Sequence, residues 1–178
     1  MSFLAMVAKA KANKSNDGDF FLPDLKGTAV IERIFQHNGD KGTSVILTAT
    51  IESCEGKKDG VTKHSPGAKV KKVYSISKFP TVAPGQLKGD ILAIDGLNED
   101  DLSSKDLEGM LGEIFENAES AMFELRGYRI GFDTRIIDRS AKGKENLTGV
   151  TFKHIENKPE ELAARAKAIT EKLKSETR

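Results

Sequence analysis

Two long runs of strand-forming residues, joined by a single turn signal, constrain the fold of this chain most strongly. Residues 27–35 read GTAVIERIF and residues 43–52 read TSVILTATIE, and both are rich in β-branched and aromatic residues. The intervening QHNGDKG carries an Asn-Gly pair, which is typical of a tight hairpin turn. In the second run alternate residues are apolar from Val45 to Ile51, and only Ile46 breaks the alternation. The pattern predicts an antiparallel hairpin with one buried face.

A third strand and a helical segment are expected next. Residues 68–77, AKVKKVYSIS, predict a strand, and their lysines indicate that one face meets solvent. Two prolines interrupt the pattern in residues 78–86. Beyond them, apolar residues recur at helical spacing in residues 87–97 and again further on, so we expect a helical insert. The later set is Leu107, Met110, Leu111, Ile114 and Phe115, with Ser103 or Ser104 as the expected N-cap.

The rest of the chain predicts further strands and a final helix. Residues 120–138 are long enough for one bent strand or two, and residues 146–156 predict another, with the turn RSAKGKE between them. In residues 158–176, Pro159 suits the first turn of a helix, and the two glutamates that follow it suit the positive end of the helix dipole. A C-terminal helix is therefore predicted.

Three strands, a helical connection and two more strands is the element order of an OB-fold, a partly open barrel. Gly127 and Gly131 fit such a barrel, because strands tolerate glycine where they bend or approach another backbone closely. Other small barrels and sandwiches share much of this order. The expected fold class is mainly β with helices, an α+β β-barrel: a five-stranded OB-fold with a helical insert between strands three and four and a C-terminal helix. The expected parts are an N-terminal arm (1–19), an OB-fold domain (20–156) and a C-terminal helix and tail (157–178).

Composition favours a soluble protein of the cytoplasm. The 178 residues suit one domain with extensions, and no apolar run reaches the roughly 20 residues that a membrane helix needs. The apolar start MSFLAMVAKAKANKS is too short for a secretory signal and has no basic residue before it. The single cysteine, Cys54, cannot form an internal disulfide, which fits a reducing compartment. We expect no membrane partner, and we expect the apolar start and the terminal helix to make contacts outside the barrel, either by self-association or by packing back on the domain.

Charge is unevenly distributed, although the formal net charge is only +1. Residues 56–78 hold seven lysines and one acid, or +6, and residues 121–154 hold seven basic and four acidic residues, or +3. Between these two basic stretches, residues 90–119 hold ten acids and one lysine, or −9. The acidic stretch would serve either to bind partners or to repel a polyanion from the wrong face of the protein.

The strand that follows Gly127 predicts two sets of side chains, because alternate residues of a strand point to opposite faces. The expected interior set is Tyr128, Ile130, Phe132 and Ile136. The expected outward set is Arg129, Gly131, Asp133 and Arg135. The lysines of the third predicted strand would add a second row of cations. In a small barrel the surfaces of the third and fourth strands can border one groove.

Interleaved cations and rings are typical of proteins that bind single-stranded nucleic acid without reading its sequence, because cations contact phosphates and rings stack on bases. The expected stacking platforms are Tyr74, Phe79 and Tyr128, whereas Phe132 and Phe152 are expected inside the barrel. The complete candidate set is Lys69, Lys71, Lys72, Tyr74, Lys78, Phe79, Arg126, Tyr128, Arg129, Arg135, Arg139, Lys142 and Lys144.

The sequence gives no support to an enzyme. His37, His64, His154 and Cys54 lie far apart and form none of the short-spaced clusters that mark zinc sites. The segment NGDKGTS lacks the glycine spacing and the ending of a P-loop. We therefore expect no catalytic residue, no metal and no cofactor.

The segments SPGAKVKKVYSISKFP, RGYRIGFDT and KGKENLTGVTFKHI together resemble the OB-fold single-stranded DNA-binding proteins encoded by bacteriophages. The similarity covers about residues 20 to 155. It implies a protein that coats and protects single-stranded DNA during phage replication, recombination or repair in the bacterial host cytoplasm, without a cofactor. The groove that it implies is built from Lys69, Lys71, Lys72, Tyr74, Arg126, Tyr128, Arg129 and Arg135, with Lys142 and Lys144 at its edge.

One feature departs from that family. Many of its members end in an acidic, flexible tip that recruits replication or recombination proteins, whereas residues 156–178 hold six basic and five acidic residues. Two other functions stay open: an interaction protein of phage or host whose basic hairpin docks an acidic protein surface, and a nuclease or other nucleic-acid enzyme.

Overall fold

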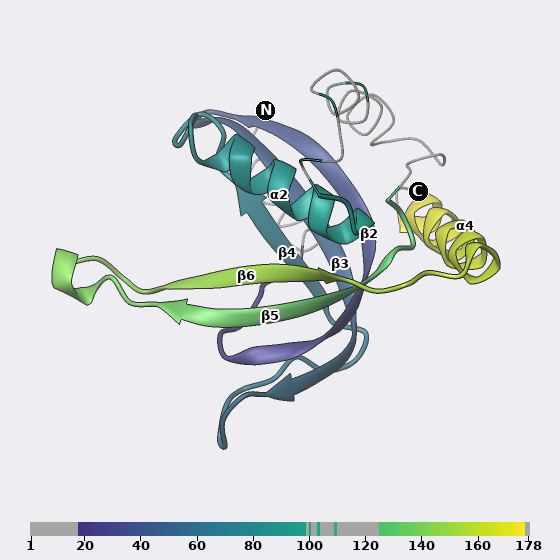
Figure 1. Cartoon of the computed structure of the whole chain (residues 1–178), viewed down its shortest axis with the longest axis horizontal. Coiled ribbons are helices and arrows are strands. Elements are labelled where there is room, and N and C mark those ends of the chain that lie inside the picture. Colours follow the sequence, from purple (N-terminus) through teal and green to yellow (C-terminus); the bar gives the residue numbers. More distant parts are fainter. Residues whose placement is uncertain (1–17, 99, 101–102, 104–108, 110–124, 177–178) are drawn as a thin grey trace, which may run out of the picture.

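The computed structural model describes residues 18–98, 100, 103, 109 and 125–176. Within this part, the chain forms one six-stranded mixed sheet, two α-helices and a short 3-10 helix (Figure 1). The strands are β1 (Asp19–Phe20), β2 (Leu25–Gly39), β3 (Gly42–Gly56), β4 (Lys69–Tyr74), β5 (Arg129–Ile137) and β6 (Leu147–His154). The helices are α2 (Ala83–Asp95), η2 (Ser140–Lys142) and α4 (Pro159–Glu176).

The sheet curls into a half-barrel around β2. The strand order is β1-β4-β3-β2-β5-β6, so β2 pairs with β3 on one side and with β5 on the other. All pairs are antiparallel except β1 with β4. Register shifts in β2, between Thr28 and Ala29 and between Ile31 and Arg33, mark bulges, which bend a strand and increase its twist.

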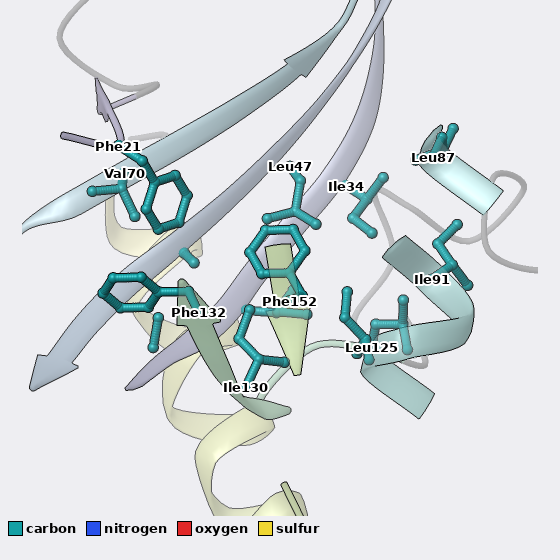
Figure 2. Packing of buried hydrophobic residues seen from close by; sticks show 14 of the residues in the cluster. Phe21, Ile34, Leu47, Val70, Leu87, Ile91, Leu125, Ile130, Phe132 and Phe152 are labelled. Atoms are coloured by element: carbon teal, nitrogen blue, oxygen red, sulfur yellow. The ribbon is translucent and has the colours of Figure 1, made fainter. Parts of the chain in front are cut away.

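The hydrophobic core fills the concave face of the sheet, and α2 covers its open end (Figures 1 and 2). Three aromatic rings meet there edge to face, with the centroid of Phe21 5.3 Å from Phe132 and 6.1 Å from Phe152. Leu87 and Ile91 of α2 close the core from the helix side. This burial of apolar surface is the main term that holds the half-barrel together.

A polar cluster bridges the gap between β4 and β6, for which no ladder pairing is described. Lys72 Nζ of β4 donates to the Val150 carbonyl oxygen of β6 at 2.9 Å and lies 2.6 Å from Asp90 Oδ2 of α2. The Tyr74 hydroxyl donates a hydrogen bond to the same carboxylate oxygen. At the C-terminal end of α2, His154 Nδ1 of β6 donates to the Ile94 carbonyl oxygen at 2.9 Å. Side chains thus fasten α2 to both β4 and β6.

Helix α4 lies on the convex face of the sheet and is held mainly by polar contacts. Arg165 Nε donates to the Gly127 carbonyl oxygen at 2.8 Å, and Lys69 Nζ lies 3.2 Å from Glu176 at the end of the helix. Gly127 has φ +86°, and a Cβ added there would lie 2.8 Å from Ala166 N. Glycine at position 127 therefore permits both the local turn and the close approach of α4, as the sequence predicted for a barrel glycine.

The coarse prediction of a mainly β protein with helices is confirmed, and so are the terminal helix and a helical insert after the third predicted strand. The predicted count of five strands is wrong, because β1 adds a sixth strand beside β4. Two residues are too short a strand for any periodic pattern to reveal. The prolines do not exclude a helix, since α2 begins at Ala83 with Pro84 in its first turn, where proline is tolerated. Residues 1–17 of the expected N-terminal arm, and all of the helix expected at 107–115 except Gly109, lie outside the described residues, whereas Asp19 belongs to β1.

Candidate nucleic-acid interface

Strand register places four residues in one row across the convex face of the sheet. Arg33 of β2 pairs with Thr48 of β3, and Thr48 pairs with Lys71 of β4. Lys71 in turn pairs with Phe20 of β1. Directly opposed residues share one face of a sheet, so two cations and one aromatic ring stand side by side, with Thr48 buried between the cations. We call Phe20, Lys71 and Arg33 the cationic row.

Each cation of the row lies against an aromatic ring. Lys71 Nζ is 5.1 Å from the ring centroid of Phe20, and Arg33 Cζ is 4.4 Å from the ring centroid of Phe35. Phe20 keeps 63% of its surface exposed, which is unusual for a phenylalanine. An exposed ring beside a cation offers a stacking face and a phosphate contact in one place.

A second exposed pair follows β4. Phe79 is 50% exposed, and Lys78 Nζ lies 5.3 Å from its ring centroid. Both were predicted as binding residues, and the structure leaves both accessible.

The other candidates on β4 are engaged within the fold. Tyr74, predicted as a stacking platform, is 1% exposed, and its ring belongs to the core. Burial and the Asp90 carboxylate raise the pKa of Tyr74 well above its usual range. Lys72 points to the same carboxylate, while Lys69 lies 3.2 Å from Glu176 and 3.9 Å from Glu32. The prediction for Tyr74 is therefore corrected: its ring has no face available to a base.

The candidates at the start of β5 are also held internally. Arg126 is 4% exposed and donates from Nε to the Glu32 carbonyl oxygen at 3.0 Å, so its assignment to the groove is corrected to that of a structural residue. Tyr128 is half-buried against the core. Arg129 makes a two-bond contact with Glu52, at 2.7 and 3.0 Å, and this carboxylate raises the pKa of the Arg129 guanidinium.

The outer part of β5 and β6 projects from the half-barrel as a two-stranded hairpin, with η2 at its tip (Figure 1). We call residues 135–149 the wing. Arg135, Lys142 and Lys144 are exposed on it, whereas Arg139 donates from Nε to the Glu145 carbonyl oxygen at 2.8 Å and so braces the tip. Ile136 was predicted inside the barrel but is 46% exposed. The wing extends beyond the hydrophobic core, so the side chain of Ile136 has no core to pack against.

The structure does not bring the predicted cations into one groove. Strands β4 and β5 were expected to border it, yet β3 and β2 lie between them in the sheet. The accessible candidates instead form two groups: Lys71, Lys78 and Phe79 near β4, and Arg135, Lys142 and Lys144 on the wing. Three residues near the first group were missed: Phe20, Arg33 and Phe35. Strict alternation along residues 27–35 would place Arg33 and Phe35 on the face of Ile31, so no local pattern reveals the last two.

Nothing in the described part of the chain gathers three side chains that could hold a metal ion. His64 accepts a hydrogen bond from the Leu22 N–H at 3.0 Å, and burial lowers the pKa of this imidazole. Together with His154 at α2, it serves the packing of loops and helix ends.

No protein-family model, curated protein or solved structure matches this chain. Among the described helices, none is long and apolar enough to cross a membrane. Function is therefore inferred from the site itself.

Proposed function

We propose that this protein binds single-stranded DNA with little sequence specificity, and that it coats and protects such strands during replication, recombination or repair. The observation that carries the proposal is the cationic row, in which Lys71 and Arg33 stand beside exposed or half-exposed rings on a single sheet face. A positive track with aromatic platforms is the arrangement that non-specific single-strand binding requires.

The strand order supports an OB-fold as the finer description of the half-barrel. If β2 to β6 are its five strands, β1 is an addition, and the convex face of β3 and β4 corresponds to the strand 2–3 face that binds oligonucleotides in that fold. The wing corresponds to the loop between strands four and five, which also contacts oligonucleotides there. In that description Lys71 and the cations of the wing fall on surfaces that an OB-fold uses for binding. A bacteriophage origin and action in the host cytoplasm belong to the same proposal.

A second candidate function is docking of the wing on an acidic protein surface. It is favoured by three exposed aliphatic side chains of the wing, Ile136, Ile137 and Leu147. Side chains of this type contribute little to phosphate binding, but they are suited to a protein interface with an apolar centre.

A fluorescence titration with single-stranded and duplex oligonucleotides of one sequence, at several salt concentrations, tests the proposed function. We expect tighter binding to the single strand and a linear fall of log affinity with log salt, at a slope of about −0.7 per contacted phosphate. Equal or tighter binding to the duplex across the salt series contradicts the proposal.

A further inference from the structure

An open pocket of about 270 Å³, which we call the cavity, lies between α4 and the convex face of the sheet. Its apolar walls are Val30 of β2 and Ala168 and Ile169 of α4. Its polar lining consists of Glu32 and Thr50 on the sheet side and Arg165 and Lys172 on the helix side. Lys172 is exposed, so the cavity reaches the molecular surface. Pockets for drug-sized ligands run from roughly 300 Å³ upward, so this volume suits a single flat ring system.

Glu32 is the chemically unusual member of the lining. It is only 5% exposed, and its carboxylate accepts a hydrogen bond from the Thr50 hydroxyl at one oxygen. The other oxygen lies 3.9 Å from Lys69 Nζ, beyond hydrogen-bond distance. An ionised carboxylate can accept about four hydrogen bonds, so Glu32 retains capacity for a ligand that donates.

The cavity adjoins the proposed strand-binding surface. Thr50 pairs with Val30 on one side and with Lys69 on the other, and this row lies two residues along the same face from the cationic row. Two residues of a strand span roughly 7 Å. A nucleic-acid strand that contacts Lys71 and Arg33 therefore passes close to the mouth of the cavity.

We propose that this cavity is a base-binding subsite that prefers guanine, an inference that rests on the proposed single-strand binding. The Glu32 carboxylate can only accept, and guanine presents two adjacent donors, N1–H and the N2 amino group, on its Watson–Crick edge. Adenine and cytosine place an acceptor nitrogen beside their amino group, and thymine flanks its single N–H with two carbonyls. Val30 and Ile169 offer apolar surface to the ring, and the exposed Lys172 of α4 offers a cation to a backbone phosphate.

The test compares an oligothymidine of about 16 nucleotides, a length that covers the usual site of one such barrel, with versions carrying one central guanine, adenine or cytosine. We expect the guanine version to bind at least about fivefold tighter than the other three, the factor that corresponds to the lower end of discrimination by a bidentate base contact. Glu32→Gln should abolish this preference, which is read as the ratio of the affinities for the guanine version and for plain oligothymidine of the same variant. Glu171→Gln is the matched control, because it removes the same charge from α4 at an exposed residue outside the cavity lining, and it should keep the preference.

Because Glu32 is buried, Glu32→Gln could act by destabilising the fold, so a second, separate variant is needed. Ala168→Phe adds a ring from the helix side of the cavity and leaves the Glu32 carboxylate in place. Loss of the guanine preference in a folded Ala168→Phe variant supports the subsite. Equal wild-type affinity for all four oligonucleotides overturns the subsite but leaves the proposed function standing. If the guanine preference is retained in the Glu32→Gln variant and in the Ala168→Phe variant, the subsite is also overturned. Failure of the wild-type protein to bind any of the four overturns the proposed function, and the subsite with it.

Discussion

Lys72 and Asp90 form a largely buried ion pair, with Nζ 2.6 Å from Oδ2, that fastens α2 to β4 at the open side of the half-barrel. The side chains are 18% and 15% exposed, and the Tyr74 hydroxyl donates to the same carboxylate. Removing one partner of such a pair is costly, because the remaining charge stays buried without compensation.

Asp90→Ala should therefore lower the free energy of unfolding by about 3 to 5 kcal/mol. It leaves the Lys72 ammonium and the Tyr74 hydroxyl without the acceptor that they share. Chemical denaturation measures the loss, and Gln86→Ala, at an exposed position of the same helix, is the control. A loss no greater than that of the control would show that the cluster is dispensable for α2.

The cationic row predicts two distinguishable effects on DNA binding. Lys71→Ala should weaken binding to all sequences alike and flatten the salt slope by about 0.7, because one fewer phosphate is contacted. Phe20→Ala should lower affinity by about 1 to 3 kcal/mol with the slope retained, because stacking releases few ions. Titration at several salt concentrations measures both. Lys26→Ala, at an exposed cation near the other end of β2, should change neither, and equal behaviour of Lys71→Ala and Lys26→Ala would remove the row from the interface.

The wing separates the two candidate functions. Replacing Arg135, Lys142 and Lys144 together by alanine should flatten the salt slope for single-stranded DNA by about 2, if each contacts one phosphate. Replacing Ile137 and Leu147 by serine should leave that slope intact. If instead the arginine and lysine changes leave DNA binding untouched, the wing lies outside the DNA interface, and docking on an acidic protein becomes the better account of it.

Gly127 and Gly60 form a matched pair for testing how α4 is held. Both have positive φ, +86° and +77°, but a Cβ at Gly127 would meet the backbone of Ala166 whereas a Cβ at Gly60 would meet nothing within 4 Å. Each change to alanine carries backbone strain of about 1 to 3 kcal/mol. Gly127→Ala should be more destabilising than Gly60→Ala in thermal or chemical unfolding, and the difference reports the packing of α4. If both variants lose the same free energy of unfolding, α4 can shift to accommodate the added methyl group without a measurable loss of stability.

Stability should fall in acid through Asp133. Lys57 Nζ donates to Asp133 Oδ1 at 2.6 Å, and this hydrogen bond is the main cause that lowers the pKa of the carboxyl. A carboxyl with a lowered folded-state pKa stabilises the fold above its unfolded pKa, and this contribution is lost as pH falls below about 4. Asp133→Asn should therefore show a shallower loss of unfolding free energy over that range than the wild-type protein. Parallel pH profiles of the two proteins would exclude Asp133 as a contributor.

Local pattern was sufficient for much of the secondary structure. Pro159 and the acidic residues after it predicted α4, and the Asn-Gly pair predicted the β2–β3 hairpin. Helix starts and tight turns depend on a few neighbouring residues, so the sequence contains nearly all the information that they need.

Burial of polar residues could not be predicted in the same way. Arg126 looks like a surface cation in a basic stretch, yet its donors meet the Glu32 carbonyl oxygen and the Thr170 hydroxyl, 94 and 44 residues away along the chain. The sequence likewise predicted Tyr74 as an exposed ring. In the structure its ring is buried in the core, and its hydroxyl donates a hydrogen bond to Asp90 of α2. Such partners exist only once distant elements have packed.

The sequence by itself determined which residues are cations, which are rings, and where most strands and helices lie. Tertiary structure alone decided which of them share a surface. Ile31 and Ile34 are both buried in the core, and the bulge between Ile31 and Arg33 adds the extra residue that makes this possible. Strict alternation would have placed Arg33 on the core face with Ile31, whereas the bulge shifts Arg33 and Phe35 to the convex face beside Lys71. The reason is physical: a one-residue shift exchanges the two faces of a strand, and the pairing of β2 with its neighbours, not its own sequence, fixes where that shift falls.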